Sequence, residues 1–101
     1  MSANIEKRLT RMEDIEEIKQ LIARYAKAAD HNGDPALMAP CFSADVVWNC
    51  EGIGGLEGRD AVVAGLRETS TVVLPWALHY MTQPIITVAD DGQTAEGEYY
   101  L

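Results

Sequence analysis

The fold is decided by the stretch Ile15-Glu-Glu-Ile-Lys-Gln-Leu-Ile-Ala-Arg-Tyr-Ala-Lys-Ala-Ala-Asp30. Its apolar residues recur at steps of three and four, which is the spacing of an amphipathic helix. We predict a long helix from about Glu6 to Asp30, ended by the turn residues His31-Asn-Gly-Asp34 with Gly33 near the C-cap. On a helical projection the apolar stripe spans roughly 140°, and Asp30 lies about 40° beyond its edge. The Asp30 carboxylate is therefore expected at the margin of the buried face.

The composition is that of a soluble globular protein and excludes several classes of function. The 101 residues suffice for one domain, and 48% are hydrophobic while 24% are charged. A net charge of -8 disfavours nucleic acid and anionic membranes as partners. Apolar runs fall short of the roughly 18 residues of a membrane span, and the charged N-terminal stretch has no signal-peptide core, so we expect a cytoplasmic protein. Cys41 and Cys50 are then expected as free thiols, and no zinc-site spacing suggests a metal.

Turn signals divide the rest of the chain into short elements. Asp34-Pro35 has the cap and the first-turn proline of a helix start, and Pro40 limits this helix to one or two turns. Asp90-Asp-Gly-Gln93 is typical of a hairpin turn. We predict a strand over 44–51, a glycine-rich turn or bulge over 52–55, a helix over 58–69, an apolar strand that contains His79, and a returning strand over 94–101.

This order of elements predicts an α+β fold. Helices would pack on one face of a curved antiparallel sheet of about three strands. Pro84 cannot donate a hydrogen bond within a sheet, so a bulge or an open edge is expected there.

Asp30 and His79 are the candidate catalytic residues, although each also has an ordinary structural interpretation. An Asp that ends a helix is most often a cap or a surface residue, and a single His in an apolar strand is most often a core residue. In a strand, His79 shares a face with Met81 and Gln83, and such a mixed face suits a pocket lining. An imidazole oriented by a carboxylate is a good proton acceptor.

The other candidate residues remain open from the sequence. Tyr25 on the inner stripe suits either core packing or a pocket, and Trp48 is expected to point inward. Cys41 and Cys50 lack the surroundings of a nucleophile. The glycine-rich segment 52–55 lacks the strand–helix context of a phosphate loop.

A succession of short motifs resembles the SnoaL-like branch of the nuclear transport factor 2-like superfamily. The resemblance covers nearly the whole chain from about Leu9. It implies a cone-shaped fold with a long helix across a strongly curved sheet and a pocket inside the cone. Polyketide cyclases, ketosteroid isomerase, limonene epoxide hydrolase, dehydratases and non-catalytic proteins share this fold, so the fold does not settle the function. The motifs are Tyr25-x4-Asp30, Phe42-Ser-Ala-Asp45-Val, Gly58-Arg-Asp-Ala61, Leu78-His79-Tyr80 and Asp91-Gly92.

The combination of Tyr25, Asp30, Trp48 and His79 is similar to the site of hexachlorocyclohexane dehydrochlorinase and of the bile-acid and scytalone dehydratases. This resemblance implies that His79 is the general base, that Asp30 orients it, and that Tyr25 assists the leaving group. Trp48, Tyr80 and Met81 would contact the substrate.

The resemblance leads us to expect a cofactor-independent lyase or isomerase with an Asp–His dyad, acting on a small hydrophobic molecule in a central pocket. The alternatives are a non-catalytic ligand-binding protein and an accessory subunit of a larger oxygenase. A homodimer or homotrimer is expected.

Relatives with this fold are longer and finish with further strands. We therefore expect residues 1–101 to form a single SnoaL-like domain whose C-terminal strands are missing, either by truncation or because a partner chain supplies them.

Overall fold

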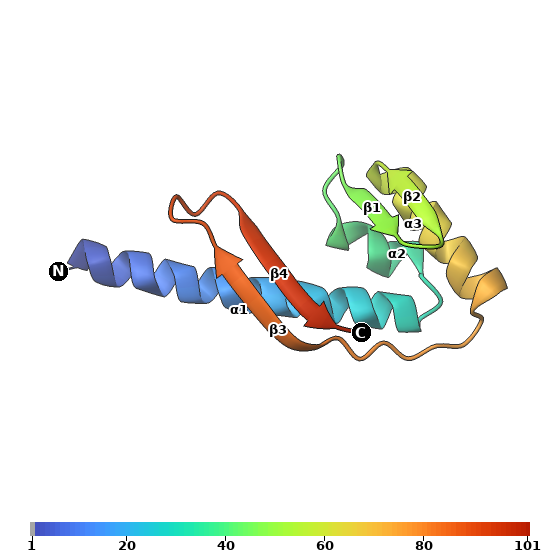
Figure 1. Ribbon diagram of the computed structural model, residues 1–101, viewed down its shortest axis with the longest axis horizontal. Helices are drawn as coiled ribbons and strands as arrows, with labels where there is room; N and C mark the ends of the chain where they lie inside the picture. The colour runs from blue at the N-terminus through green and yellow to red at the C-terminus, as the bar shows by residue number, and fades with distance from the viewer. Residues whose placement is uncertain (1) are drawn as a thin grey trace. The chain divides into compact units, whose positions relative to one another are not determined.

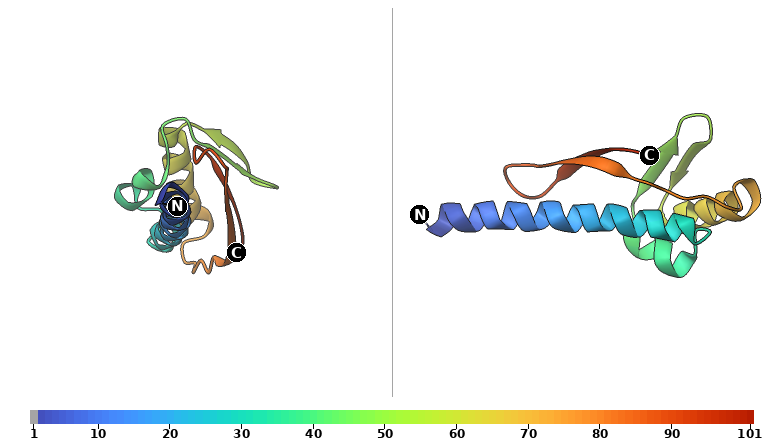
Figure 2. Two further views of the ribbon diagram at one scale, coloured as in Figure 1. Left: turned by 90° about the vertical axis from the view of Figure 1, so that its left-hand side faces the viewer. Right: turned by 90° about the horizontal axis from the view of Figure 1, so that it is seen from below.

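A single long helix, α1 (Ser2–Asp30), forms the first part of the protein in a computed structural model that describes residues 2–101 (Figure 1). It begins a few residues before the predicted start near Glu6, because the segment before that point contains no helix breaker. The helix is continuous over its 29 residues (Figure 2). Its buried residues are Ala26, Ala28 and Ala29, all near its C-terminal end. The end of α1 is thus the part of the helix that takes part in a core.

The chain divides into two compact units. The first comprises the part of the chain up to Ala23 together with Tyr80–Leu101, and the second is Arg24–His79. The boundary falls between His79 and Tyr80, so both members of the candidate dyad belong to the second unit.

The second unit is built around the end of α1 and the helix α3 (Arg59–Glu68). Between them lie α2 (Pro35–Met38), the 3-10 turn η1 (Ala39–Cys41) and two short strands, and the π-helical turn η2 (Thr69–Val73) continues α3. Asp34 caps α2 as predicted, because its side chain accepts a hydrogen bond from the N–H of Ala36 at 3.0 Å. The buried core contains Ala28, Ala29, Met38, Val62, Val63 and Leu66.

The two strands of this unit form an antiparallel hairpin, β1 (Val47–Cys50) and β2 (Gly54–Glu57). Trp48 pairs with Leu56, and both side chains are partly buried and pack against the core, so the inward position predicted for Trp48 is confirmed. The sequence predicts a turn or a bulge over the glycine-rich segment 52–55. Its second half is instead the strand β2, because glycines can pair through their backbone despite their low strand propensity.

The β-structure of the first unit is a second antiparallel hairpin, β3 (Thr82–Val88) and β4 (Ala95–Tyr100). The predicted turn is confirmed, with the Gly92 N–H donating to Ala89 O at 2.9 Å. The pairing shifts between Thr82 and Ile85, where Gln83 has a φ of 55°, so the bulge predicted at Pro84 is confirmed as well.

Two expectations about the strands were wrong. One sheet of about three strands is expected from the sequence, but residues 2–101 contain two separate two-stranded sheets. His79 does not lie in a strand, because β3 begins only at Thr82 and the residues before it are irregular. The α+β class itself is confirmed, with a long N-terminal helix, short helices and antiparallel strands.

Candidate functional site

The site begins at the turn that ends α1. Asn32 has a φ of 59° and occupies the left-handed position that follows a helix end, and the N–H of Gly33 donates back to Ala28 O at 3.0 Å. This bond spans five residues, as the longer of the two bonds in a Schellman motif does. The next residue, Gly33, also has a positive φ, of 64°, and a Cβ there would meet Leu66 O at 3.0 Å and Arg67 Cα at 3.1 Å. The turn is therefore pressed against the backbone of α3, which fixes the place of Asp30 just before it.

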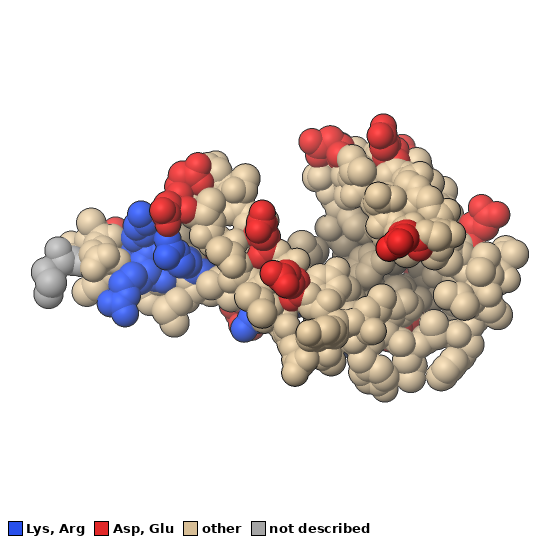
Figure 3. All heavy atoms as spheres, in the orientation of Figure 1, with Lys and Arg blue, Asp and Glu red and all other residues tan. Residues whose placement is uncertain are grey.

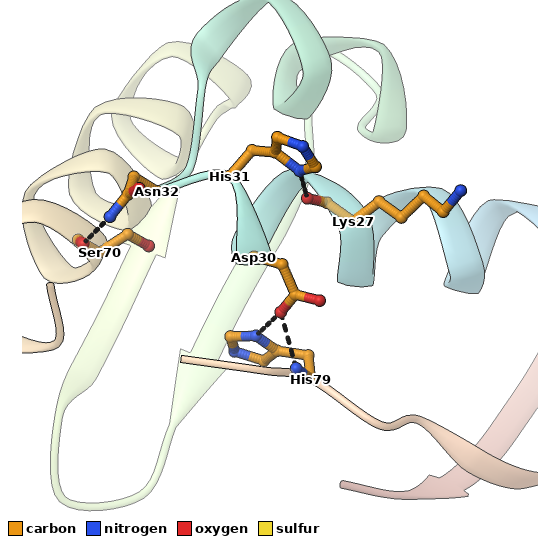
Figure 4. Close-up of polar contacts among 6 residues, drawn as sticks. All are labelled: Lys27, Asp30, His31, Asn32, Ser70 and His79. Carbon is orange, nitrogen blue, oxygen red and sulfur yellow. Dashed lines mark hydrogen bonds and ion pairs between the residues drawn. The ribbon is translucent and has the colours of Figure 1, made fainter. Parts of the chain in front are cut away.

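Asp30 and His79 are brought together by this arrangement (Figure 4). One carboxylate oxygen, Asp30 Oδ1, lies 2.8 Å from His79 Nδ1 and also accepts the backbone N–H of His79 at 2.7 Å. The two side chains are each 23% exposed, so the pair is half-buried and keeps some contact with solvent. The same carboxylate oxygen thus contacts both the ring and the backbone of the histidine.

This geometry assigns different tasks to the two ring nitrogens of His79. A carboxylate accepts hydrogen bonds, so Asp30 keeps the proton of the neutral ring on Nδ1 and leaves the lone pair on Nε2. When Nε2 takes up a second proton, the charged ring forms an ion pair with Asp30 across the same 2.8 Å contact. The arrangement can therefore accept a proton at Nε2 and stabilise the resulting charge.

Tyr25 lies on a different side of α1. It precedes Asp30 by five residues, which places it about 140° away around the helix axis at about 100° per residue. Its ring forms a T-shaped contact with the ring of Phe42, with ring centroids 6.0 Å apart and planes inclined by 73°, and the side chain packs against the core. The core-packing interpretation of Tyr25 is thus met, and its predicted catalytic role stays a prediction.

Tyr80 and Met81 follow His79 directly in the chain but belong to the first unit. Tyr80 is exposed and Met81 is half-buried. Their predicted contacts with a substrate therefore stay predictions.

The second histidine, His31, has a different environment. Its Nδ1 lies 2.7 Å from the backbone oxygen of Lys27, and the residue is exposed (Figure 4). His31 closes the last turn of α1 and does not share the carboxylate of Asp30, in agreement with its interpretation as a loop residue.

Both cysteines are free and half-buried. Burial raises the pKa of the Cys41 thiol above its ordinary value, and the nearby Arg24 guanidinium offsets part of that increase. A raised pKa favours the unreactive thiol over the nucleophilic thiolate. Cys41 is therefore suited to packing and not to nucleophilic catalysis.

The first unit carries a separate charged surface. Basic side chains gather on the first turns of α1 (Figure 3), where Lys7, Arg8 and Arg11 line a shallow hollow. Arg11 forms an exposed ion pair with Asp90, at 3.5 Å. None of the residues predicted for the active site lines this hollow.

Asn32 is the site residue that sequence reasoning missed. Its side chain amide donates to the backbone oxygens of Ser70 and Pro75, at 3.0 and 2.8 Å. The signal was present in the Asn-Gly pair after a helix, since Asn is the non-glycine residue that most readily adopts a positive φ.

The sequence from residue 10 to residue 101 matches the model of the SnoaL-like domain. The chain belongs to the SnoaL-like family. This agrees with the α+β fold and with the motifs that gave the resemblance. No curated protein matches this SnoaL-like chain.

Among solved structures, the SnoaL-like chain is similar to the crystal structure of an NTF2-like protein with a cystatin-like fold from Novosphingobium aromaticivorans, determined at 1.16 Å resolution. The TM-score is 0.82 and the sequences are 30% identical. The match covers 96% of this chain but 62% of the other, so the chain spans less than two thirds of that protein. The NTF2-like fold is thereby confirmed. None of the helices in the described part of the chain has the length and apolar character of a membrane span.

Proposed function

We propose that this SnoaL-like domain is a cofactor-independent lyase or isomerase in which His79 removes a proton from carbon in a small hydrophobic substrate. The proposal is supported most strongly by one observation, the double contact of Asp30 Oδ1 with the ring nitrogen and the backbone N–H of His79, at 2.8 and 2.7 Å. This contact orients the ring and leaves Nε2 as the nitrogen that can accept a proton.

The chemistry follows from the two ring nitrogens. His79 Nε2 takes a proton from a carbon next to a carbonyl or a leaving group, and the C–H electron pair forms a new double bond. In an elimination, the leaving group departs with its own bonding pair. In an isomerisation, the π pair of the carbonyl moves onto its oxygen to give an enolate, which collapses as the proton returns to another carbon. Asp30 stabilises the charged ring in both cases. A positioned base contributes roughly 10²–10⁴-fold to such a step.

Tyr25 would assist the leaving group and would take no part in proton removal. Its hydroxyl would donate a hydrogen bond to the departing group, as the resemblance to dehydratases implies, while Trp48 would contact the substrate. Tyr25→Phe keeps the ring that packs on Phe42 and removes only the hydroxyl. We expect it to slow elimination but to leave proton removal unchanged.

The test uses a probe that needs no leaving group. A panel of small cyclic ketones is incubated with the protein in D₂O, and the exchange of the α-protons for deuterium is followed by NMR. We expect the wild type to exchange the α-protons, and we expect the exchange rate to be roughly 10²–10⁴-fold lower in His79→Ala. Asp30→Asn keeps an oxygen that can accept both hydrogen bonds, so a smaller loss in this variant measures the contribution of the negative charge.

His31→Ala is the matched control, because it removes the other imidazole of the protein one residue after Asp30. We expect it to exchange the probe at the wild-type rate. Exchange that persists in His79→Ala would show that the base lies elsewhere. Binding of the ketones without any exchange in the wild type would instead favour the ligand-binding alternative.

A further inference from the structure

The turn after α1 holds not only His79 but also the segment that leads to it. The Asn32 side chain amide donates one hydrogen bond to Ser70 O, at 3.0 Å, and another to Pro75 O, at 2.8 Å (Figure 4 shows the first). The backbone oxygen of Asn32 accepts a hydrogen bond from Arg67 Nη1, also at 3.0 Å. One residue therefore connects the end of α1 with α3, with the π-helical turn and with the loop that follows.

The loop between Pro75 and His79 has little other support. The last turn-type hydrogen bond before it runs from the Leu74 N–H to Thr69 O, at 2.7 Å. Among the described residues, no backbone–backbone hydrogen bond holds Trp76, Ala77 or Leu78. Asn32 thus holds the loop at Pro75, and Asp30 holds it at His79. Asp30 and Asn32 themselves are only two residues apart in the chain.

We propose that Asn32 is a positioning residue for the Asp30–His79 pair. It fixes the path of residues 70–75 so that the loop places His79 next to the Asp30 carboxylate. The inference rests on the proposed function for its catalytic consequence, but its structural part can be tested without any substrate.

The residue type fits this task in two ways. The amide has two N–H donors, and both are used on carbonyl oxygens that face it. The backbone at this position has a φ of 59°, which Asn tolerates better than other residues that carry a donor of this length. An Asp would place a carboxylate against two carbonyl oxygens, and a Gly would keep the backbone but lose both hydrogen bonds.

Two variants separate these contributions. Asn32→Gly preserves the left-handed backbone and removes the amide, while Asn32→Asp preserves the shape of the side chain and removes the donors. Thr71→Val is the matched control, because it removes the hydrogen bonds of Thr71 Oγ1 to Arg67 O and Glu68 O, at 2.8 and 3.4 Å, and leaves the side chain of Asn32 unchanged.

The readouts are taken on His79 by NMR. In both Asn32 variants we expect the backbone N–H of His79 to exchange with solvent about tenfold faster, because its hydrogen bond to Asp30 opens more often. We also expect the downfield signal of the hydrogen-bonded Nδ1 proton to weaken. Thr71→Val should change neither quantity, and fluorescence-detected unfolding verifies that all three variants are folded under the conditions of the measurement.

The inference is overturned if His79 keeps its exchange rate and its ring signal in both Asn32 variants, or if Thr71→Val changes them to the same extent. With a substrate in hand, kcat should fall about 10–100-fold in the Asn32 variants with little change in KM, because a misplaced base impairs chemistry more than binding. Absence of turnover in the wild type would contradict the proposed function and would leave the NMR result on Asn32 intact.

Discussion

The replacement of Asp30 by Ala should cost more stability than the replacement of His79 by Ala. The reason is that one oxygen, Asp30 Oδ1, accepts two hydrogen bonds, from the His79 ring and from the His79 backbone. Asp30→Ala removes both of them. His79→Ala removes only the ring contact, since the backbone N–H remains and can still donate to Asp30.

The magnitude follows from the character of these contacts. A hydrogen bond to a charged group contributes about 1.5–3 kcal/mol when buried. Both side chains are 23% exposed, so water can reach the freed groups and we take the lower part of that range. Asp30→Ala, which removes two such bonds, should therefore lower the free energy of unfolding by about 3–4 kcal/mol, and His79→Ala, which removes one, by about 1.5–2 kcal/mol. The double variant should reveal a coupling energy of about 1 kcal/mol between the two side chains.

Urea unfolding followed by tryptophan fluorescence measures these values. Trp48 and Trp76 are the two tryptophans of the chain, and both lie in the unit Arg24–His79 that contains the pair. The fluorescence change therefore reports the unfolding of the relevant unit. Equal losses in the two single variants would refute the double role of Asp30 Oδ1, and a coupling energy near zero would refute the ring contact.

Three further outcomes are expected. Gly33→Ala should destabilise the protein by about 2–4 kcal/mol, because its φ is 64° and a new Cβ would lie 3.0–3.2 Å from backbone atoms of α3. Gly52 has a φ of 84° but open space around it, so Gly52→Ala should lower the free energy of unfolding by only about 1 kcal/mol in the same urea assay. Gln83→Gly should stabilise the β3–β4 hairpin by about 0.5–1 kcal/mol, seen as a higher midpoint in circular dichroism, because Gln83 has a φ of 55°; a lower midpoint would contradict this. The alkylation of Cys41 in a Cys50→Ser background should reach half its maximal rate at a higher pH in the folded protein than in urea, because burial raises the pKa of this thiol; the reverse order would be inconsistent with that burial.

The long helix and the turns could be predicted from sequence because their signals are local. The recurrence of Ile15, Ile18 and Ile22 indicates α1, Asp34-Pro35 indicates the start of α2, and the segment 90–93 indicates the turn between β3 and β4. Each of these features depends on residues within one or two turns of chain. The structure confirms all three.

The strands were harder to predict because pairing depends on distant residues. Gly54 and Gly55 have low strand propensity, yet they pair with Cys50 and Asn49 in the β1–β2 hairpin. The apolar character of the segment around His79 suggested a strand, but the histidine lies in the irregular chain before β3. Its position is decided by the contact with Asp30, 49 residues earlier in the sequence, which no local pattern contains.

The pair itself could be named from sequence only through the family resemblance. Helix geometry placed Asp30 at the edge of the apolar stripe, and the structure shows it half-buried at 23% exposure. The role of Asn32 could not be predicted, because its two acceptors, Ser70 O and Pro75 O, are backbone atoms that any sequence would supply. When a side chain binds backbone atoms, the residue types of its partners are not constrained, so the partners cannot be recognised in the sequence.

The most direct test of the Asp30–His79 pair is the tautomer of the His79 ring, read from its two ¹⁵N chemical shifts at a pH where the ring is neutral. His31→Ala simplifies the measurement, because it leaves His79 as the single histidine of the chain. We predict a proton on Nδ1 and a free lone pair on Nε2, and we expect this preference to disappear in Asp30→Ala. A ring that carries its proton on Nε2 would contradict the assignment of His79 as the base.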